Sequence, residues 1–454
     1  MAQNYTADYL KIADFEKEGK FKSALEAANA LFKKADRDGD EDDMLKVMAI
    51  RAAYTFQLEE NGVEAALKLF NDELANNRNR PVIAPVLHYL IGRGYYTYGQ
   101  QNQYRLRNAT AVENGDRPGI GAPLEDWNLQ QLKEAAEEHL LRSLELAMSK
   151  RTELSSIPVV VRGNKETFQL RPTLYDLLAE NAMNSLGSPL LSVGNANPDQ
   201  PVRFLVTAAD FANIDISDLD AENGNTRRLK IYQDLTKYHL AEKGAALLDV
   251  DMRRVKFIQQ MGTSVEDNLA TWERMYGEYT GAPRRGLLKV EQARLYVRTD
   301  DKLGKNPKAK ALSLLDEIKS KDPAVVNARE QLRRNITTQD LNVVNQEVTV
   351  IDGNILLRVG YHNVDRVYHR LVRKTNKDQT ASYYNIDQKL INALKKRKAA
   401  AAKDFRLPAN GDYNKHSTET WLPAVPSGEY ILLTSDNKSF DLSKGHVSRS
   451  DLQV

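Results

Sequence analysis

The chain has 454 residues, a length that accommodates about three domains, or a long helical array followed by one further domain. Its 64 Lys and Arg nearly balance its 62 Asp and Glu, and a net charge of +2 gives no overall field that would attract nucleic acid. Cysteine is absent, which excludes disulfides, thiolate metal ligands and a cysteine nucleophile, and no run of about 18 apolar residues is present to span a membrane.

Residues 1–340 are predicted to be mostly helical. Apolar residues recur at helical spacing on both sides of Gly19, and again on both sides of Gly62, so each glycine is expected to mark the turn of a helical hairpin. The two glycines are 43 residues apart, which falls within the periods of helical-pair repeats. Because each pair buries only one face, the pairs are expected to stack into a tetratricopeptide-like helical-repeat array.

Later segments of this region follow the same pattern, with one exception. Residues 132–148, 229–250 and 311–318 are predicted to be helical from their apolar spacing. Residues 158–170 combine a Val-rich run, a polar turn and a second short run, which predicts a small β-hairpin inserted into the helical region.

From Leu341 onward the apolar period changes to two, which predicts strands. Asp352-Gly353-Asn354 has the composition of a hairpin turn. Ile391–Lys403 is basic and rich in alanine and is predicted to be a helix within the β region. The fold class is therefore multidomain α + β, with a helical array over 1–340 and an antiparallel β-sandwich over 341–454. The last residues still alternate like a strand, so this sandwich is expected to be truncated at its C-terminus.

Three short segments carry a resemblance to a known family. Leu422–Leu433 contains Leu-Pro followed by Pro-Ser-Gly-Glu-Tyr, which resembles a strand signature of macroglobulin domains. Asn363–Leu371 is similar to another strand of those domains. Pro172–Ala179 resembles part of the N-terminal helical region of large bacterial α2-macroglobulins. Together these segments indicate the N-terminal portion of a bacterial α2-macroglobulin, with a macroglobulin-like sandwich at 341–454.

The resemblance implies a protein that traps proteases. In that family a protease cuts an exposed bait region and the protein then closes around it, and many members carry a thioester built from Cys and Gln. No thioester can form within this chain because it has no cysteine. The expected role is a non-catalytic scaffold portion of such an inhibitor, with proteases as partners of the complete protein, in the periplasm, cell envelope or outside the cell. The polar residues at the start of the chain predict no signal peptide or lipid anchor within it.

A cluster of tyrosines is the candidate binding site. Tyr89, Tyr95, Tyr96 and Tyr98 lie close together in one predicted helix, and aromatic rings add contact area on the concave faces of helical arrays. The alternative is ordinary packing between helices. As a binding site, this cluster favours a second function, capture of peptide or glycan by an envelope protein similar to the SusD-like nutrient-binding proteins. A hydrolase is the third alternative, but the spacing assembles no nucleophile, base and orienting group.

Three further motifs are interpreted as structural. Asp36–Asp43 is acidic but lacks the glycine and glutamate positions of a calcium loop, so its aspartates are expected to cap the helix that follows. His362 and His369 have no zinc spacing. Lys395–Lys398 has no interleaved aromatic residues, which favours a solvated helical insert over a nucleic-acid or lipid site. No catalytic, cofactor-binding or metal-binding residue is therefore predicted.

Overall fold

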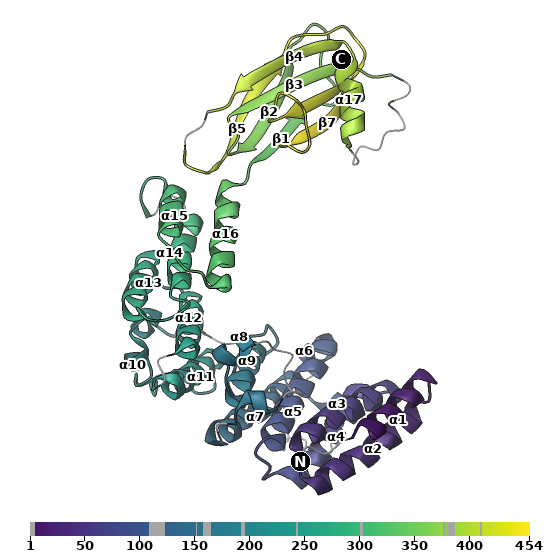
Figure 1. Ribbon diagram of the computed structural model, residues 1–454, viewed down its shortest axis with the longest axis vertical. Coiled ribbons are helices and arrows are strands. Elements are labelled where there is room, and N and C mark those ends of the chain that lie inside the picture. Colours follow the sequence, from purple (N-terminus) through teal and green to yellow (C-terminus); the bar gives the residue numbers. More distant parts are fainter. Residues whose placement is uncertain are drawn as a thin grey trace. The chain divides into compact units, whose positions relative to one another are not determined.

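The computed structural model describes residues 5–108, 123–150, 152–157, 165–191, 196–241, 244–299, 303–375, 378, 386–408 and 411–454. The chain divides into two compact units, Met1–Ser264 and Val265–Val454. Helices dominate the first unit and the beginning of the second, and two antiparallel sheets follow at the C-terminal end (Figure 1). The predicted order of a helical region and then a β region is confirmed.

The described part of the first unit is mainly helical. Its helices are α1 (Thr6–Lys17), α2 (Phe21–Asp38), α3 (Glu41–Leu58), α4 (Gly62–Asn77), α5 (Ile83–Gln101), α6 (Gln103–Asn108), α7 (Leu129–Lys150), α8 (Lys165–Leu170), α9 (Leu174–Leu186), α10 (Ala208–Phe211), α11 (Gly224–His239) and α12 (Ala245–Gln259), with 3-10 turns at Leu124–Asp126, Leu154–Ser156 and Pro201–Phe204.

Local chemistry fixes the ends of these helices. Gly19 lies between α1 and α2 at φ +70°, a backbone conformation that glycine adopts without steric strain. Asp40 accepts a hydrogen bond from the backbone N–H of Asp43 at 3.1 Å and so caps α3, as expected for the acidic segment. Thr173 and Asp176 form a reciprocal capping box at the start of α9.

Two predicted elements of this unit differ in the structure. The second half of the hairpin expected at 158–170 is helix α8, and residues 158–164 lie outside the described part of the chain. A strand needs a paired neighbour for its backbone groups, whereas α8 forms a short helix that packs against α12. The helix expected over 229–250 is interrupted, because α11 ends at His239 and α12 begins at Ala245.

A buried arginine connects segments of the first unit that are distant in sequence. Arg254 of α12 is fully buried and donates from Nε and Nη2 to Oδ1 of Asp251, at 2.8 and 2.5 Å. It also donates to the carbonyl oxygens of Phe204 and Val206, at 2.5 and 2.9 Å. A single guanidinium thereby ties α12 to the chain segment that follows the Pro201–Phe204 turn, in an interior where water cannot replace these bonds.

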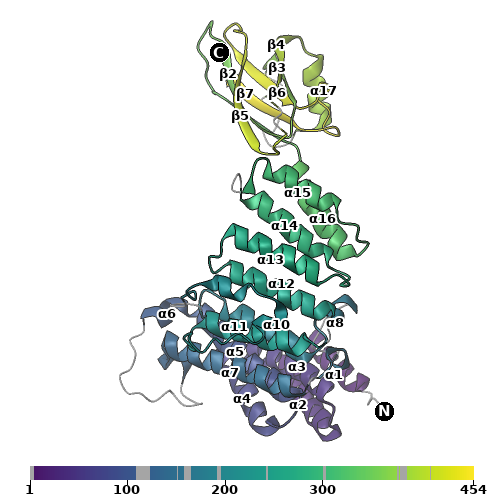
Figure 2. The ribbon, with the colours of Figure 1, turned by 90° about the vertical axis from the view of Figure 1, so that its left-hand side faces the viewer.

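The second unit begins with four helices and continues as strands. The helices are α13 (Val265–Glu278), α14 (Gly286–Arg298), α15 (Pro307–Asp316) and α16 (Pro323–Thr337), of which α13, α14 and α15 lie one after another (Figure 2). The strands are β1 (Asp340–Asn345), β2 (Ile355–His362), β3 (Arg366–Arg373), β4 (Ala399–Arg406), β5 (Lys415–Leu422), β6 (Glu429–Ser435) and β7 (Val447–Gln453), and α17 (Gln388–Lys396) precedes β4. The change from helix to strand thus falls at the predicted position near residue 340.

The strands form two antiparallel sheets, with orders β1-β2-β5 and β4-β3-β6-β7. Residues from both sheets, such as Leu357 of β2 and Leu432 of β6, share one buried cluster. The opposite side of the four-stranded sheet is also covered, because Ile391 and Leu394 of α17 pack against Ile431 of β6. The two inner strands of this sheet, β3 and β6, therefore have apolar side chains packed on both of their faces.

Two assignments in the β region are corrected. Residues 399–403, predicted as helix, belong to strand β4, because Ala401 packs in the cluster between the sheets and β4 pairs with β3. Tertiary pairing overrides the helical propensity of alanine there. Val350, predicted as a strand residue, lies in the loop between β1 and β2 and is exposed, whereas Val348 forms an isolated parallel bridge with Gln453 of β7.

Candidate functional site

The predicted tyrosine cluster lies on α5, which packs against α7. Tyr95, Tyr96 and Tyr98 are buried, and Tyr89 is partly exposed. Tyr95 stacks on Trp127 with 5.4 Å between ring centroids, and burial raises the pKa of its phenol. The hydroxyl of Tyr96 accepts a hydrogen bond from Gln100 at 2.7 Å. Three of the four rings thus serve the packing of α5, which was the alternative interpretation, and ligand binding by the cluster stays a prediction.

The glycines of the same helix allow this close packing. A Cβ atom on Gly92 would lie 2.9 Å from the backbone oxygen of Ala136 and 2.9 Å from Cγ of Leu140, both on α7. Real Cβ atoms do not approach so closely, so α5 and α7 can lie together only because position 92 has no side chain.

Three histidines, His88, His139 and His369, are at least partly buried in the described part of the chain. His88 and His139 approach each other across α5 and α7 with 3.2 Å between their Nδ1 atoms, and burial lowers the pKa of each to about 4. Burial also lowers the pKa of His369 to about 4, and its Nδ1 lies 3.0 Å from the Thr434 hydroxyl. Among the described residues, no group of three or more His, Asp or Glu side chains could hold a metal ion.

One pair consists of residue types that are common in active sites, an aspartate and a histidine, but solvent does not reach it. Asp176 and His239 approach to 2.6 Å, and both side chains are buried from solvent. Asp176 also accepts from the backbone N–H and the hydroxyl of Thr173. The pair therefore joins α9 to α11 in the interior, where a substrate could not reach it.

The basic run at 395–398 is largely engaged within its own domain. Arg397 donates two hydrogen bonds of 2.7 Å to the carboxylate of Asp378, and Lys395 donates to the backbone oxygen of Ser439. Arg370 of β3 donates to the backbone oxygens of Lys395 and Arg397. These contacts fix the end of α17 against the sheet, which favours the structural interpretation of this run.

Exposed hydrophobic side chains gather at one end of the two sheets. The end of β1, the start of β2 and the end of β5 meet there, together with the loop between β1 and β2. We call this the apolar end; its members and exposed fractions are Val344 56%, Val348 67%, Val350 77%, Ile351 64%, Leu356 46% and Trp421 45%. Scattered exposed hydrophobic residues are ordinary, whereas these six come from adjoining strand ends and the loop between two of them.

The strand register explains why these residues share one end. Leu356 and Trp421 are direct cross-strand partners on the outer side of the three-stranded sheet. Lys403 of β4 places its ammonium group 3.0 Å from the centre of the Trp421 ring, a cation–π contact. The opposite end of the sheets instead meets helices of the same unit, since Asn363 donates to the backbone oxygens of Ile336 and Thr338.

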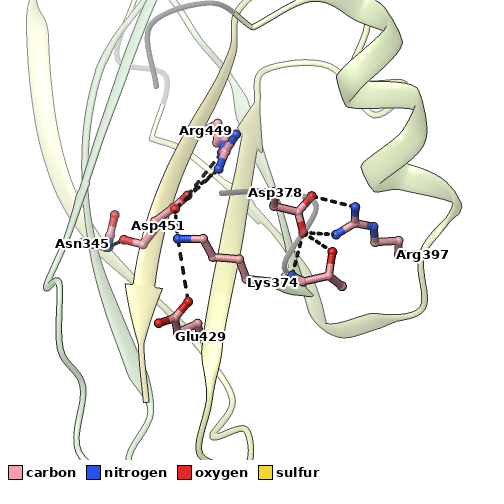
Figure 3. Close-up of polar contacts among 8 residues, drawn as sticks. Asn345, Lys374, Asp378, Arg397, Glu429, Arg449 and Asp451 are labelled. Carbon is pink, nitrogen blue, oxygen red and sulfur yellow. Dashed lines mark hydrogen bonds and ion pairs between the residues drawn. The ribbon is translucent and has the colours of Figure 1, made fainter. Parts of the chain in front are cut away.

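Charged residues border the apolar end on the four-stranded sheet (Figure 3). Lys374, just after β3, lies 2.7 Å from the carboxylate of Asp451 and 3.8 Å from that of Glu429. The hydrogen bond with Asp451 raises the pKa of Lys374. Arg449 contributes a second cation, 3.2 Å from Asp451. These two cations and two carboxylates balance one another, and Arg373 at the end of β3 adds a further cation there, whose Nη2 donates to the backbone oxygen of Ser427 at 3.3 Å.

One feature of the sequence could have predicted part of the apolar end. Val350 and Ile351 stand directly before the turn Asp352-Gly353, where the alternation of apolar and polar residues fails. Two adjacent apolar residues cannot both face the interior from an extended segment, so this pair indicates that at least one of them is exposed. The cation over Trp421 depends on the pairing of distant strands and has no local signal.

Replacing Trp421 by serine is expected to reduce the exposed apolar surface without unfolding the domain. The binding of the dye 1-anilinonaphthalene-8-sulfonate should decrease, while the free energy of unfolding changes by about 1 kcal/mol or less, because the ring is already half in water. Dye fluorescence and urea unfolding measure the two quantities. Leu442→Ser is the matched control, since Leu442 is exposed to a similar degree in the loop between β6 and β7. An equal loss of dye binding in both variants would contradict an apolar end.

No helix within the described residues is both long enough and apolar enough to cross a bilayer. No protein-family model matches this sequence, and a search of curated proteins finds no match either.

Proposed function

We propose that this chain is a non-catalytic scaffold, the N-terminal portion of an α2-macroglobulin-like inhibitor that traps proteases. In this proposal the helices form a tetratricopeptide-like array and the two packed sheets form a macroglobulin-like β-sandwich. The site of action is a surface that holds other domains in place, and the protein is exported to the periplasm, the cell envelope or the outside of the cell.

The apolar end is the observation that carries the proposal. A scaffold acts by packing against neighbouring domains, and exposed hydrophobic side chains provide the free energy for such packing. The C-terminal residue lies at this same end, since Val454 exchanges backbone hydrogen bonds of 2.9 and 3.0 Å with Gly428. A domain that followed Val454 in the complete inhibitor would therefore emerge beside the apolar end.

The segment that resembles macroglobulin domains also adopts a conformation consistent with the proposal. It covers the end of β5, a proline-containing connection and strand β6. Gly428 has φ +154°, and Tyr430 is buried between the sheets with its hydroxyl donating to the backbone oxygen of Pro426 at 2.5 Å. The motif residues thus have a structural task, the entry into a central strand, which supports the resemblance through fold rather than through chemistry.

The complete gene product is expected to inhibit a protease by enclosure. After incubation with trypsin, cleavage of a large substrate such as casein should fall, while cleavage of a small chromogenic peptide continues, because only the small substrate reaches an enclosed active site. Residues 1–454 alone should neither hydrolyse casein nor inhibit trypsin. Stoichiometric inhibition by residues 1–454 would overturn the scaffold role, and a gene that ends at codon 454 would remove the trap.

A further inference from the structure

A cavity of about 800 Å³ opens between α7 and α11 in the first unit, within the range of about 300–1,000 Å³ that is typical of ligand pockets. Leu144 of α7 and Ile231 of α11 line its walls, and Tyr175 of α9 lies at its base. Residues 212–222, which connect α10 to α11, contribute most of one side, and we call this segment the lip. Met148 extends the apolar wall of α7 to the surface.

The lip is held in place by side chains outside it. Gln233 of α11 donates from Nε2 to the backbone oxygens of Phe211 and Ile214, at 3.0 and 2.8 Å. Arg203 lies 2.8 Å from the carboxylate of Asp218 in the lip. The cavity is therefore formed before any occupant arrives, which reduces the ordering that binding would require.

The charges on the α11 wall are paired with one another. Arg227 contacts Glu137 of α7 and lies 2.5 Å from Glu222, and Lys230 lies 3.0 Å from Asp234. Because these charges are neutralised locally, the interior of the cavity offers an occupant chiefly the aliphatic and aromatic walls. A charged group would lose hydration there without gaining a new partner.

The lip adds negative charge beside the cavity. It carries four carboxylates within eight residues, at Asp215, Asp218, Asp220 and Glu222. Asp218 is paired with Arg203 and Glu222 with Arg227, so Asp215, which lines the cavity, and the nearby Asp220 provide the charge that an occupant would meet. Hydrogen bonds from Ser217 lower the pKa of Asp215, and the bond from Arg203 lowers the pKa of Asp218, so both are ionised at neutral pH. An occupant that is apolar in the middle and cationic at its ends would match both the walls and the mouth.

We propose that this cavity binds a peptide segment in which one or two large apolar side chains are flanked by Lys or Arg. The apolar side chains fill the space between α7 and α11, and the flanking cations face the carboxylates of the lip. This binding site is independent of the scaffold role proposed above and of the tyrosines on α5, and it gives the helical region a ligand of its own.

Fluorescence anisotropy with labelled peptides tests the proposal on the 454-residue chain. The probe Lys-Lys-Leu-Phe-Leu-Lys-Lys is expected to bind saturably and more weakly as salt rises, since exposed charges at the mouth are screened. Two control peptides should each bind at least about tenfold more weakly. Glu-Glu-Leu-Phe-Leu-Glu-Glu carries negative instead of positive charges, and Lys-Lys-Ser-Gly-Ser-Lys-Lys lacks the large apolar side chains. Equal binding of all three peptides, or no binding of the first, would overturn the proposal.

Two variants separate the lip from other acidic surfaces. Asp215→Asn with Asp220→Asn removes two charges and keeps an oxygen that can accept the backbone hydrogen bonds now made to each side chain. The affinity for the first peptide is expected to fall about threefold to tenfold, with a shallower salt dependence. The control, Glu26→Gln with Glu59→Gln, removes two exposed charges from α2 and the end of α3 and should leave the affinity unchanged. If the two double variants lost affinity equally, binding would depend on the net charge of the protein and not on the carboxylates of the lip.

Discussion

Replacing Arg254 by methionine is expected to lower the free energy of unfolding of the first unit by about 3–5 kcal/mol. The guanidinium is fully buried, and its hydrogen bonds to Asp251, Phe204 and Val206 have no access to water that could replace them. Methionine fills a similar length but donates nothing, so two backbone carbonyls lose their side-chain donor and a buried carboxylate loses its counter-charge. Urea unfolding followed by circular dichroism measures the loss.

The neighbouring residue provides the control for this prediction. Arg253 also pairs with an aspartate, Asp249 at 3.0 Å, but its side chain is partly exposed. Arg253→Met should therefore cost only about 0–1 kcal/mol. Hydrogen–deuterium exchange should place the loss of protection in the Arg254 variant around residues 201–206. A similar loss of stability in the two variants would show that burial of the guanidinium does not determine how much the free energy of unfolding falls.

Replacing Asp378 by asparagine is expected to destabilise the β region by about 2–4 kcal/mol at neutral pH. Its carboxylate accepts two hydrogen bonds from Arg397 and two from Thr375, all at 2.7 Å, and joins the segment after β3 to the end of α17. Asparagine keeps the shape but removes the charge that the guanidinium faces. Loss of this contact should release α17 from the outer side of the four-stranded sheet.

The effect of this substitution should depend on pH in a defined direction. The bonds from Arg397 hold the pKa of the Asp378 carboxyl well below its usual range. A depressed folded-state pKa stabilises the fold above the unfolded-state value of about 3.9, and this stabilisation is lost as pH falls further. The stability difference between wild type and variant should therefore be constant near pH 7 and shrink below about pH 4. Asp404→Asn, which removes a half-exposed pair with Arg366, should cost about 0–1 kcal/mol, and a larger effect there would contradict the argument.

Local signals predicted much of the secondary structure. Gly19 acts through its backbone conformation and Asp40 through capping, each within a few residues of its position, and these two residues and Gly62 mark helix boundaries as expected. The alternation in β2 likewise identified this strand, because the period of two is visible in the sequence itself.

The features that could not be predicted from the sequence depend on contacts between residues that are distant in the chain. Ala401 has a strong preference for helix, and only its pairing with Leu371 places it in a strand. The bond between Arg397 and Asp378, and the cavity beside the lip, are likewise created by the fold and leave no local pattern. Tyr95 illustrates the same limit, since a ring that packs on Trp127 and a ring that binds a ligand have identical sequence signatures.

The exposure of Trp421 also gives the chain a built-in optical reporter. The protein has three tryptophans, and Trp127 and Trp272 are buried. A collisional quencher such as acrylamide reaches only a fluorophore that touches solvent, so the quenchable part of the emission arises from Trp421. Anything that covers the apolar end should shield that emission and shift it to shorter wavelength. Occupancy of this surface can therefore be followed in real time, without a label, in the unmodified protein.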